Sequence, residues 1–190
     1  KPFSHQTKLQ DGSSQIVFQF PQNFSIGRLA FSPVTVGQGD RISEINAQGQ
    51  QLVPPGWAVR FEANDLVGDY PKLLRYFQPD DLLQLRIPKT AQRSPELIAN
   101  IARLHSLDCL ELADFRLEAS DLKTLEPLKN LRTLNISRCP VSADVMADNS
   151  VIARVHELDI AGVKNIDPII KSLGANIGRL VVSRCVLSVA

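Results

Sequence analysis

The second half of the chain repeats a short pattern of apolar and polar positions. The stretch "LRTLNISRC", residues 131–139, has apolar residues at its first, fourth and sixth places and a cysteine at its ninth. The same apolar triplet occurs five times at a near-constant interval: Leu82/Leu85/Ile87, Leu107/Leu110/Leu112, Leu131/Leu134/Ile136, Val155/Leu158/Ile160 and Ile177/Leu180/Val182. Each triplet predicts a short strand, and the near-constant interval predicts that these strands lie side by side.

The segments between the triplets have apolar residues at helical spacing. Residues 95–104, "PELIANIARL", predict a helix with Ser94 as its N-cap and Pro95 in its first turn. Residues 69–77 predict a helix that begins at Asp69 as the N-cap. Residues 142–155 and 167–177 predict further helical segments, whose inward side chains would be Val145, Met146, Ile152, Ile169, Ile170 and Leu173. Strands that alternate with helices in this way indicate a parallel sheet.

The N-terminal part of the chain, up to Asn64, has a different pattern, which predicts β structure. Residues 15–20, "QIVFQF", alternate in polarity, and residues 26–36 predict a second strand or a pair broken by Pro33. A turn is expected at "VGQGD", residues 36–40, and another at 54–56. Beyond the second turn, Trp57, Val59 and Phe61 alternate with polar neighbours. Short strands separated by turns predict a small antiparallel, sandwich-like domain over residues 1–64.

The repeated pattern resembles the leucine-rich repeat, in which Leu-x-x-Leu-x-Leu-x-x-Asn/Cys-x-Leu recurs every 20–29 residues. The resemblance covers about residues 82–190 in five copies. The chain departs from the family at place nine, which holds Thr90, Phe115, Cys139, Val163 and Cys185. The resemblance implies an α/β solenoid over residues 65–190, with about five repeats, a parallel sheet on its concave side and helices on its convex side.

A shared interval connects the two parts of the chain. Trp57 precedes Leu82 by the same interval that separates the first two triplets, so "WAVRFE" is predicted to be the strand next to the first repeat. Residues 1–64 would then form an N-terminal cap, which protects the first core layer of a solenoid. Some bacterial leucine-rich-repeat proteins are similar, with a β-module, a "VPxG" turn and a short helix before the repeats. We therefore expect one uninterrupted sheet from Trp57 to Ser183.

Side chains between the buried positions should point to the concave face, where partners of such repeats usually bind. The candidate binding residues on this face are Arg86, Glu111, Asn135, Arg138, Glu157, Asp159, Arg179 and Arg184. In one interpretation, they form a polar groove with a basic edge at Arg138 and Arg184. In the other, opposite charges on adjacent strands satisfy each other, Arg86 beside Glu111 and Glu157 beside Arg179. No aromatic residue, the usual anchor of an interface, occurs in these rows.

Motifs for catalysis are weak. Residues 37–40, "GQGD", lack the third glycine and the following helix of a nucleotide fingerprint. Glu111 and Asp159 should lie two strands apart, ~10 Å, which is long for a catalytic carboxylate pair. No CxxC or HxxxH pair suits zinc, and we expect no cofactor. The leading hypothesis is a non-catalytic protein–protein interaction module. The alternatives are a structural or spacer domain of a larger chain and an enzyme that acts on a polysaccharide or peptide.

Composition disfavours nucleic acid and membranes as partners, and the partner that we expect is a protein. A net charge of +1 does not favour nucleic acid or an anionic membrane, and no apolar run approaches the ~20 residues of a membrane span. Three cysteines are too few for a disulfide scaffold, so free thiols are expected. The chain starts at Lys1 without a methionine, which leans slightly toward an exported protein and leaves the localisation open.

The C-terminal edge of the predicted sheet is a second candidate surface. Only the short segment 183–190 follows the last triplet, too little for another covering helix. The last strand would then present unpaired N–H and C=O groups, which favour association. Either the natural chain continues, or two copies of the protein meet at this edge through Leu180, Val181 and Leu187.

Overall fold

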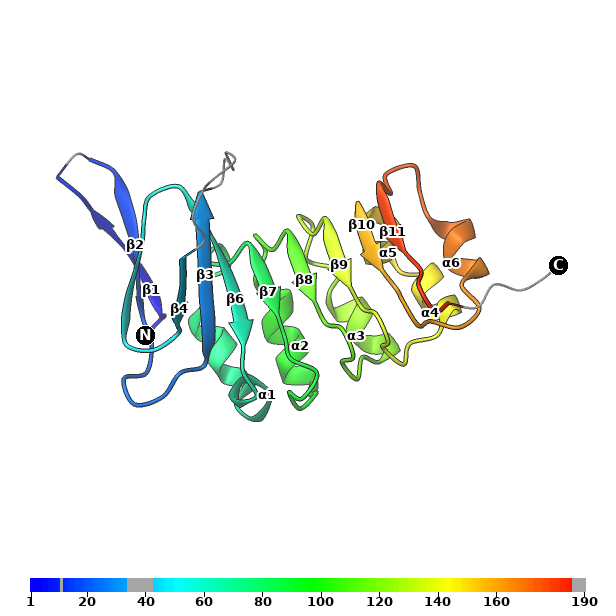
Figure 1. The fold of residues 1–190 in the computed structure, drawn as a ribbon, viewed down its shortest axis with the longest axis horizontal. Coiled ribbons are helices and arrows are strands. Elements are labelled where there is room, and N and C mark those ends of the chain that lie inside the picture. The colour runs from blue at the N-terminus through cyan, green and yellow to red at the C-terminus, as the bar shows by residue number, and fades with distance from the viewer. Residues whose placement is uncertain (11, 34–42, 186–190) are drawn as a thin grey trace.

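The computed structural model describes residues 1–10, 12–33 and 43–185, and these residues form a mixed α/β protein with two sheets (Figure 1). The larger sheet has eight strands in the order β11-β10-β9-β8-β7-β6-β3-β4, and β6 to β11 are parallel. Its strands are β3 (Gly27–Pro33), β4 (Ser43–Asn46), β6 (Trp57–Ala63), β7 (Gln84–Arg86), β8 (Cys109–Glu111), β9 (Thr133–Asn135), β10 (Glu157–Asp159) and β11 (Arg179–Val181). The smaller sheet is antiparallel and consists of β1 (Ser4–Lys8), β2 (Ser14–Gln19) and β5 (Gln50–Val53).

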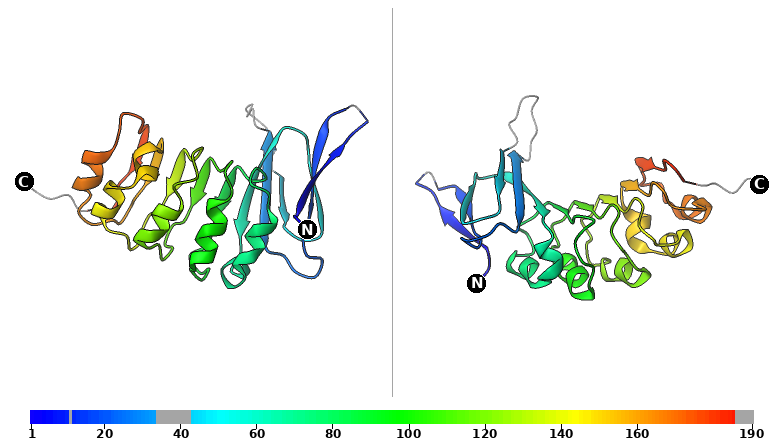
Figure 2. Two further views of the ribbon diagram at one scale, coloured as in Figure 1. Left: turned by 180° about the vertical axis from the view of Figure 1, so that it is seen from behind. Right: turned by 60° about the horizontal axis from the view of Figure 1, so that its bottom comes forward.

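The helices cover one face of the larger sheet and leave the other face open (Figure 2). They are α1 (Leu66–Asp69), the 3₁₀ helix η1 (Pro71–Tyr76), α2 (Pro95–Ala102), α3 (Ala119–Thr124), α4 (Ala143–Ala147), α5 (Ser150–Arg154) and α6 (Asp167–Ser172). Within the described residues, none of these helices has the length and apolar character needed to cross a membrane. We call the uncovered side of β6 to β11 the open face; its outward residues are Arg60, Glu62, Gln84, Arg86, Cys109, Glu111, Thr133, Asn135, Glu157, Asp159, Arg179 and Val181.

The repeated triplets form the layers of one core between the sheet and the helices. The central leucines pair in register from strand to strand, as the near-constant interval predicts: Leu85, Leu110, Leu134, Leu158 and Leu180. Every residue of the first four triplets is at most 2% exposed. The fifth triplet is less covered, and Val182 is 38% exposed.

Strand β6 belongs to both parts of the molecule, which confirms the prediction of one continuous sheet. It pairs with β3 on one side and with β7 on the other. The predicted alignment of β6 with β7 was wrong by one position. It set Trp57 level with Leu82, whereas the pairing of Phe61 with Leu85 has an interval one residue shorter. Phe61 is fully buried, whereas Trp57 is only half-buried. Phe61, not Trp57, therefore supplies the apolar side chain that continues the layers of the repeats.

The first part of the chain is held by an aromatic cluster. Phe77, which follows η1, lies 6.1 Å from Phe18 of the smaller sheet and 5.0 Å from Phe61 of the larger one, between ring centroids. Phe3 and Phe20 complete the cluster. The sequence pattern did not predict β1 and β4, and the turn expected at residues 36–40 lies outside the described residues.

Local features correct three of the helix predictions. Asp69 ends α1 instead of capping the next helix, because Tyr70 precedes a proline and leaves the helical conformation. The segment 142–155 forms two helices, since Asn149 caps α5 by accepting a hydrogen bond from the N–H of Val151 at 2.9 Å. Ile170 was expected to be inward, but it is 47% exposed. The predicted cap of α2 is confirmed, with the Ser94 Oγ accepting from the N–H of Leu97 at 3.1 Å.

Candidate functional site

The strands of the repeats end in turns that share an unusual backbone conformation. Asp114, Arg138, Gly162 and Arg184 follow β8 to β11 at the same place and have φ angles of 59°, 57°, 83° and 59°. The N–H groups of the first three donate to a carbonyl in the next turn at 2.7 to 2.9 Å. A positive φ is uncommon for residues other than glycine, so these interturn hydrogen bonds hold each turn against a local cost. The repetition places the charged side chains of Asp114, Arg138 and Arg184 at equivalent points along one edge of the open face.

Two thiols occupy the next place in equivalent ways. Cys139 Sγ donates to the carbonyl of Leu112 at 3.1 Å, and Cys185 Sγ donates to that of Ile160 at 3.2 Å. The three cysteines are free, as predicted, and Cys109 lies half-buried on the open face. Burial raises the pKa of Cys109 and of Cys139 to about 11. Both thiols are therefore protonated and weakly nucleophilic near neutral pH.

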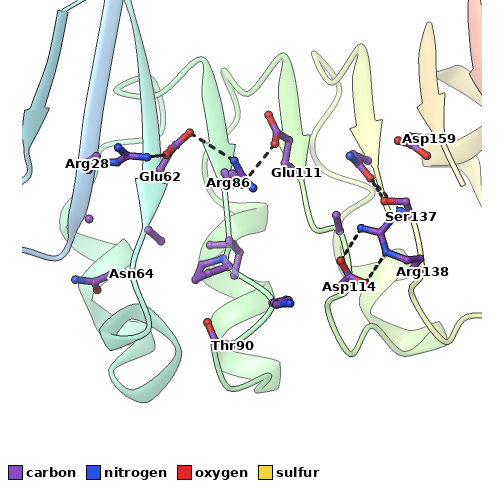
Figure 3. Close-up of a pocket in the computed structure, with 17 residues that line it drawn as sticks. Arg28, Glu62, Asn64, Arg86, Thr90, Glu111, Asp114, Ser137, Arg138 and Asp159 are labelled. Atoms are coloured by element: carbon purple, nitrogen blue, oxygen red, sulfur yellow. Dashed lines mark hydrogen bonds and ion pairs between the residues drawn. The ribbon is translucent and has the colours of Figure 1, made fainter. Parts of the chain in front are cut away.

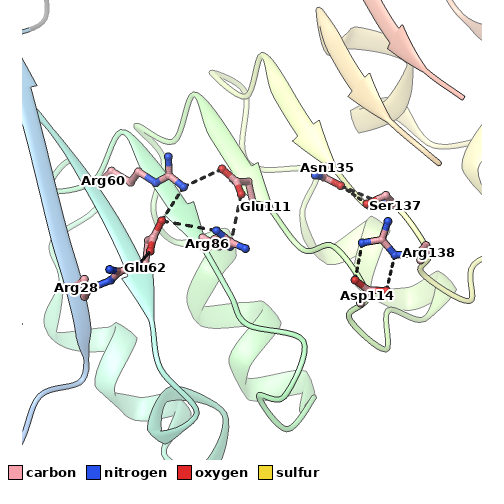
Figure 4. Close-up of polar contacts among 9 residues, drawn as sticks. All are labelled: Arg28, Arg60, Glu62, Arg86, Glu111, Asp114, Asn135, Ser137 and Arg138. Atoms are coloured by element: carbon pink, nitrogen blue, oxygen red, sulfur yellow. Dashed lines mark hydrogen bonds and ion pairs between the residues drawn. The ribbon is translucent and has the colours of Figure 1, made fainter. Parts of the chain in front are cut away.

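An ion-pair network extends from β3 across β6 and β7 to β8, along the open face (Figure 4). The carboxylate of Glu62 accepts hydrogen bonds from Arg28 and Arg60, each at 2.8 Å. Arg86 lies 3.8 Å from Glu62 and 3.7 Å from Glu111, and Arg60 lies 3.3 Å from Glu111. Partial burial raises the pKa of Glu62, but the three arginines outweigh it, so its pKa is lowered. The network holds these side chains in fixed positions.

A second ion pair joins two turns and differs from the predicted basic edge. Arg138 donates from Nε and Nη2 to the two carboxylate oxygens of Asp114, both at 2.6 Å. This hydrogen-bonded pair lowers the pKa of the Asp114 carboxyl. Asp114 therefore neutralises the charge of Arg138. Of the two arginines expected to form a basic edge, Arg184 is the one without an ion pair among the described residues. On the last two strands, Arg179 lies 3.5 Å from Glu157, as predicted.

The side chains of Asn135 and Asp159 are oriented by their own turns. Asn135 Oδ1 accepts from the N–H and the Oγ of Ser137, at 3.0 and 2.7 Å. At the equivalent place of the next strand, Asp159 Oδ1 accepts from the N–H of Ala161 at 2.9 Å. Such hydrogen bonds to the backbone two residues ahead are typical of Asn and Asp in turns. They leave Asn135 Nδ2 and Asp159 Oδ2 without a hydrogen-bond partner in the described part of the chain.

Residues of the ion-pair network, the Asp114–Arg138 pair and the side chains of Asn135 and Asp159 line a groove on the open face (Figure 3). Its volume is about 690 Å³. Five predicted site residues lie in it: Arg86, Glu111, Asn135, Arg138 and Asp159. Glu157 and Arg179 instead line a smaller hollow of about 140 Å³. Arg184 is exposed and lines neither. The structure thus brings five of the eight candidates together.

Sequence reasoning missed several residues of the groove, chiefly Arg28, Glu62, Asn64, Lys89 and Asp114. Lys89 and Asp114 stand at the same place of successive repeats, so the pattern of the repeats could have indicated them. Arg28 comes from β3, whose antiparallel pairing with β6 sets Arg28 opposite Glu62. No periodicity in the sequence reveals that neighbour.

The arrangement suits the binding of a polar ligand better than metal chemistry. Among the described residues, no group of three or more His, Cys, Asp or Glu side chains could hold a metal ion. Glu111 and Asp159 stand two strands apart with Asn135 between them, ~10 Å, and Glu111 is already paired with arginines. The groove offers fixed charges and amide groups along a shallow surface.

The candidate self-association edge is only partly described. Leu180 and Val181 are half-buried in β11, the outermost strand at this end of the larger sheet, and Leu187 lies outside the described residues. Association of two copies through this edge stays a prediction.

No family model matches the chain, and no match was found among curated proteins or solved structures. The functional argument therefore rests on the geometry of the molecule.

Proposed function

We propose that this chain is a non-catalytic protein–protein interaction module of the leucine-rich-repeat type, which binds a partner protein on its open face. The repetition supports the scaffold: the apolar triplets pair in register, the turns share a positive φ, and Cys139 and Cys185 donate to equivalent carbonyls. In this proposal the open face is the concave side of a short solenoid, and the helices form its convex side.

The groove of about 690 Å³ is the observation that carries the function. It lies on strands and on the turns that directly follow them, and ion pairs and turn hydrogen bonds fix several of its side chains before any ligand arrives. A surface that is already ordered loses little conformational entropy on binding, which favours affinity.

Residues 1–64 act in this proposal as the N-terminal cap of the repeats. Strand β6 pairs with β7, and Phe61 continues the row of buried leucines. The first layer of the repeats is thereby protected from solvent, as a solenoid requires.

The mutual satisfaction of charges favours a second candidate, a spacer domain without a ligand. Arg28, Arg60 and Arg86 lie 2.8, 3.3 and 3.7 Å from a glutamate, so much of the open face needs no partner to neutralise it. The two candidates differ in whether the groove binds anything selectively.

A peptide-display selection separates the two. Ala113 lies half-buried in the groove, and Ala113→Trp should fill it, whereas exposed Ala99 lies on α2, on the covered side of the sheet. We expect a random linear library to yield peptides that bind the wild type and Ala99→Trp equally, and Ala113→Trp at least about tenfold more weakly. Circular dichroism should show both variants folded. Selected peptides that ignore Ala113→Trp, or a library without binders, would favour the spacer.

A further inference from the structure

The charges that line the groove are not all paired. Its lining includes four basic side chains, Arg28, Arg86, Lys89 and Arg138, and four acidic ones, Glu62, Glu111, Asp114 and Asp159. Three of each take part in ion pairs: Arg28 with Glu62, Arg86 with Glu111 and Arg138 with Asp114. Within the part of the chain that the structure describes, Lys89 and Asp159 form no ion pair.

The two unpaired charges are the outer members of four charged side chains that alternate in sign from β7 to β10. Lys89, Asp114 and Arg138 hold the same place in the turns after β7, β8 and β9. Asp159 instead ends β10, three residues before the equivalent place, which Gly162 holds. The inner two hold each other through two hydrogen bonds of 2.6 Å. Lys89 acts on Asp114 and Asp159 acts on Arg138 only through longer-range electrostatic attraction. The groove therefore keeps one free positive end and one free negative end.

We propose that Lys89 and Asp159 are the charge-recognition points of the groove, and that its ligand is an extended peptide segment with one acidic and one basic side chain four or six residues apart. This inference rests on the proposed function and specifies the partner's binding segment. The acidic side chain lies at Lys89, and the basic side chain lies at Asp159.

The spacing follows from the geometry of the sheet. Strands β7 and β10 are three steps apart, which at ~4.8 Å per step is about 14 Å across the sheet. Asp159 also stands three residues before the place equivalent to Lys89, so the two Cα atoms are offset along the strands and lie about 17 Å apart. An extended peptide rises ~3.4 Å per residue, so about five residues span this distance, and the length of the Lys89 side chain accommodates one residue fewer or more. Side chains four or six positions apart in an extended chain point to the same side, whereas those five apart do not, so a spacing of four or six lets both face the groove.

The groups that line the groove can satisfy such a segment. Asp159 Oδ2 is free to accept, since the bond from Ala161 uses Oδ1, and the ammonium of exposed Lys89 has three donors. Asn135, on β9, lies between the strands of Lys89 and Asp159 and has its Nδ2 available for a peptide carbonyl. A ligand of a single charge sign would meet one favourable end and one repulsive end, so the groove selects a dipolar segment.

The test is fluorescence polarisation with labelled synthetic peptides in which Thr and Val fill the positions between the charges to favour an extended chain. The core sequences are Glu-Thr-Val-Thr-Lys, Glu-Thr-Val-Thr-Val-Thr-Lys and their reverse orders, beside versions with the charges two or eight residues apart and versions with two Glu or two Lys. We expect one order at spacing four or six to bind about fivefold or more tighter than every same-charge peptide and every peptide at spacing two or eight, with affinity falling as salt rises.

Variants link the preference to the two residues. Lys89→Gln and Asp159→Asn should each weaken the preferred peptide about threefold to tenfold, and Asp159→Asn keeps the acceptor for Ala161. Matched controls on exposed positions of the helical side, Lys123→Gln and Asp148→Asn, should have no effect. The double variant Lys89→Glu, Asp159→Lys should prefer the peptide with its two charges exchanged.

The possible failures are distinguishable. If library-selected peptides are lost in Ala113→Trp but the designed peptides show no dependence on charge or spacing, the interaction module stands and this inference is overturned. No binding of any designed peptide at millimolar concentration overturns it as well. If selected peptides ignore Ala113→Trp, both proposals fall.

Discussion

The two ends of the larger sheet are stabilised by different kinds of core. Around β3, β6 and the smaller sheet, the core is aromatic, and Phe77 contacts Phe3, Phe18, Phe20 and Phe61. From β7 onward, the core is a stack of aliphatic layers, with Phe115 as a buried aromatic exception.

The difference lies in how far apart in the sequence the contacting residues are. Phe3 and Phe77 come from distant parts of the chain, and a single ring, that of Phe77, links both sheets. A leucine of the repeats pairs with its equivalent only one repeat away along the chain. Loss of a central ring should therefore affect the whole first part, whereas loss of one leucine should be felt mainly by neighbouring layers.

The largest effect is expected for Phe77→Ala. Phe77 is 1% exposed, and its removal opens a cavity between the two sheets, which should lower the free energy of unfolding by about 3–5 kcal/mol. Urea denaturation measures the change. Phe24→Ala is the control, because Phe24 is 46% exposed and should cost well under half as much. Similar losses for the two variants would contradict a central role for the Phe77 ring.

Leu134→Ala tests a middle layer of the repeats. Leu134 is fully buried and pairs with leucines on both sides, so its loss should cost about 2–5 kcal/mol in the same assay. Leu180→Ala should cost less, because Leu180 is only half-buried at the last strand. An equal cost at both positions would contradict the expectation that the layers contribute less to stability toward β11.

Arg93→Met compares a buried ion pair with an exposed one. Arg93 donates to both carboxylate oxygens of Asp121, at 2.9 and 3.0 Å, and Asp121 is 2% exposed. Without Arg93 that carboxylate stays buried and unneutralised, which should cost about 2–3 kcal/mol. Arg28→Met, in the exposed network, should cost under about 1 kcal/mol, because solvent screens its ion pairs. Thermal or urea unfolding that ranks the two in the opposite order would refute this assignment.

Alkaline pH should weaken the fold through the thiols of Cys109 and Cys139. The folded pKa values of Cys109 and Cys139 are raised to about 11, from an ordinary value of 9.0. A raised pKa stabilises the fold below the unfolded value, and this contribution is lost as the pH rises through the folded value. The free energy of unfolding should thus fall between pH 9.0 and about 11, and less steeply in a Cys109→Ser, Cys139→Ala variant. Identical slopes in the two proteins would contradict burial of these thiols.

The sequence predicted the repeated part more fully than the rest. The apolar triplets indicated β7 to β11, their register and the pairs Arg86–Glu111 and Glu157–Arg179, because each strand has its neighbour one interval away. The pattern did not predict the Asp114–Arg138 pair, because positive φ angles in the turns redirect these side chains.

In the part of the chain before the repeats, the sequence did not predict which distant segments contact each other. Nothing in the pattern near Phe77 shows that its ring fills the space between two sheets, and Arg28 enters the groove only through the antiparallel pairing of β3 with β6. Such contacts depend on tertiary packing between distant segments, which overrides local preferences.

Pairing of β6 with β7 should join the two kinds of core into one cooperative unit, and unfolding in urea tests this most directly. Trp57, the single tryptophan, lies in β6, and its fluorescence reports unfolding of the aromatic part. The described helices all lie after Asp65, so far-ultraviolet circular dichroism of their helical signal reports unfolding of the repeats. We predict that both probes give one transition with the same midpoint and slope. Two separated transitions would show that the aromatic part and the repeats unfold independently, and would contradict the account.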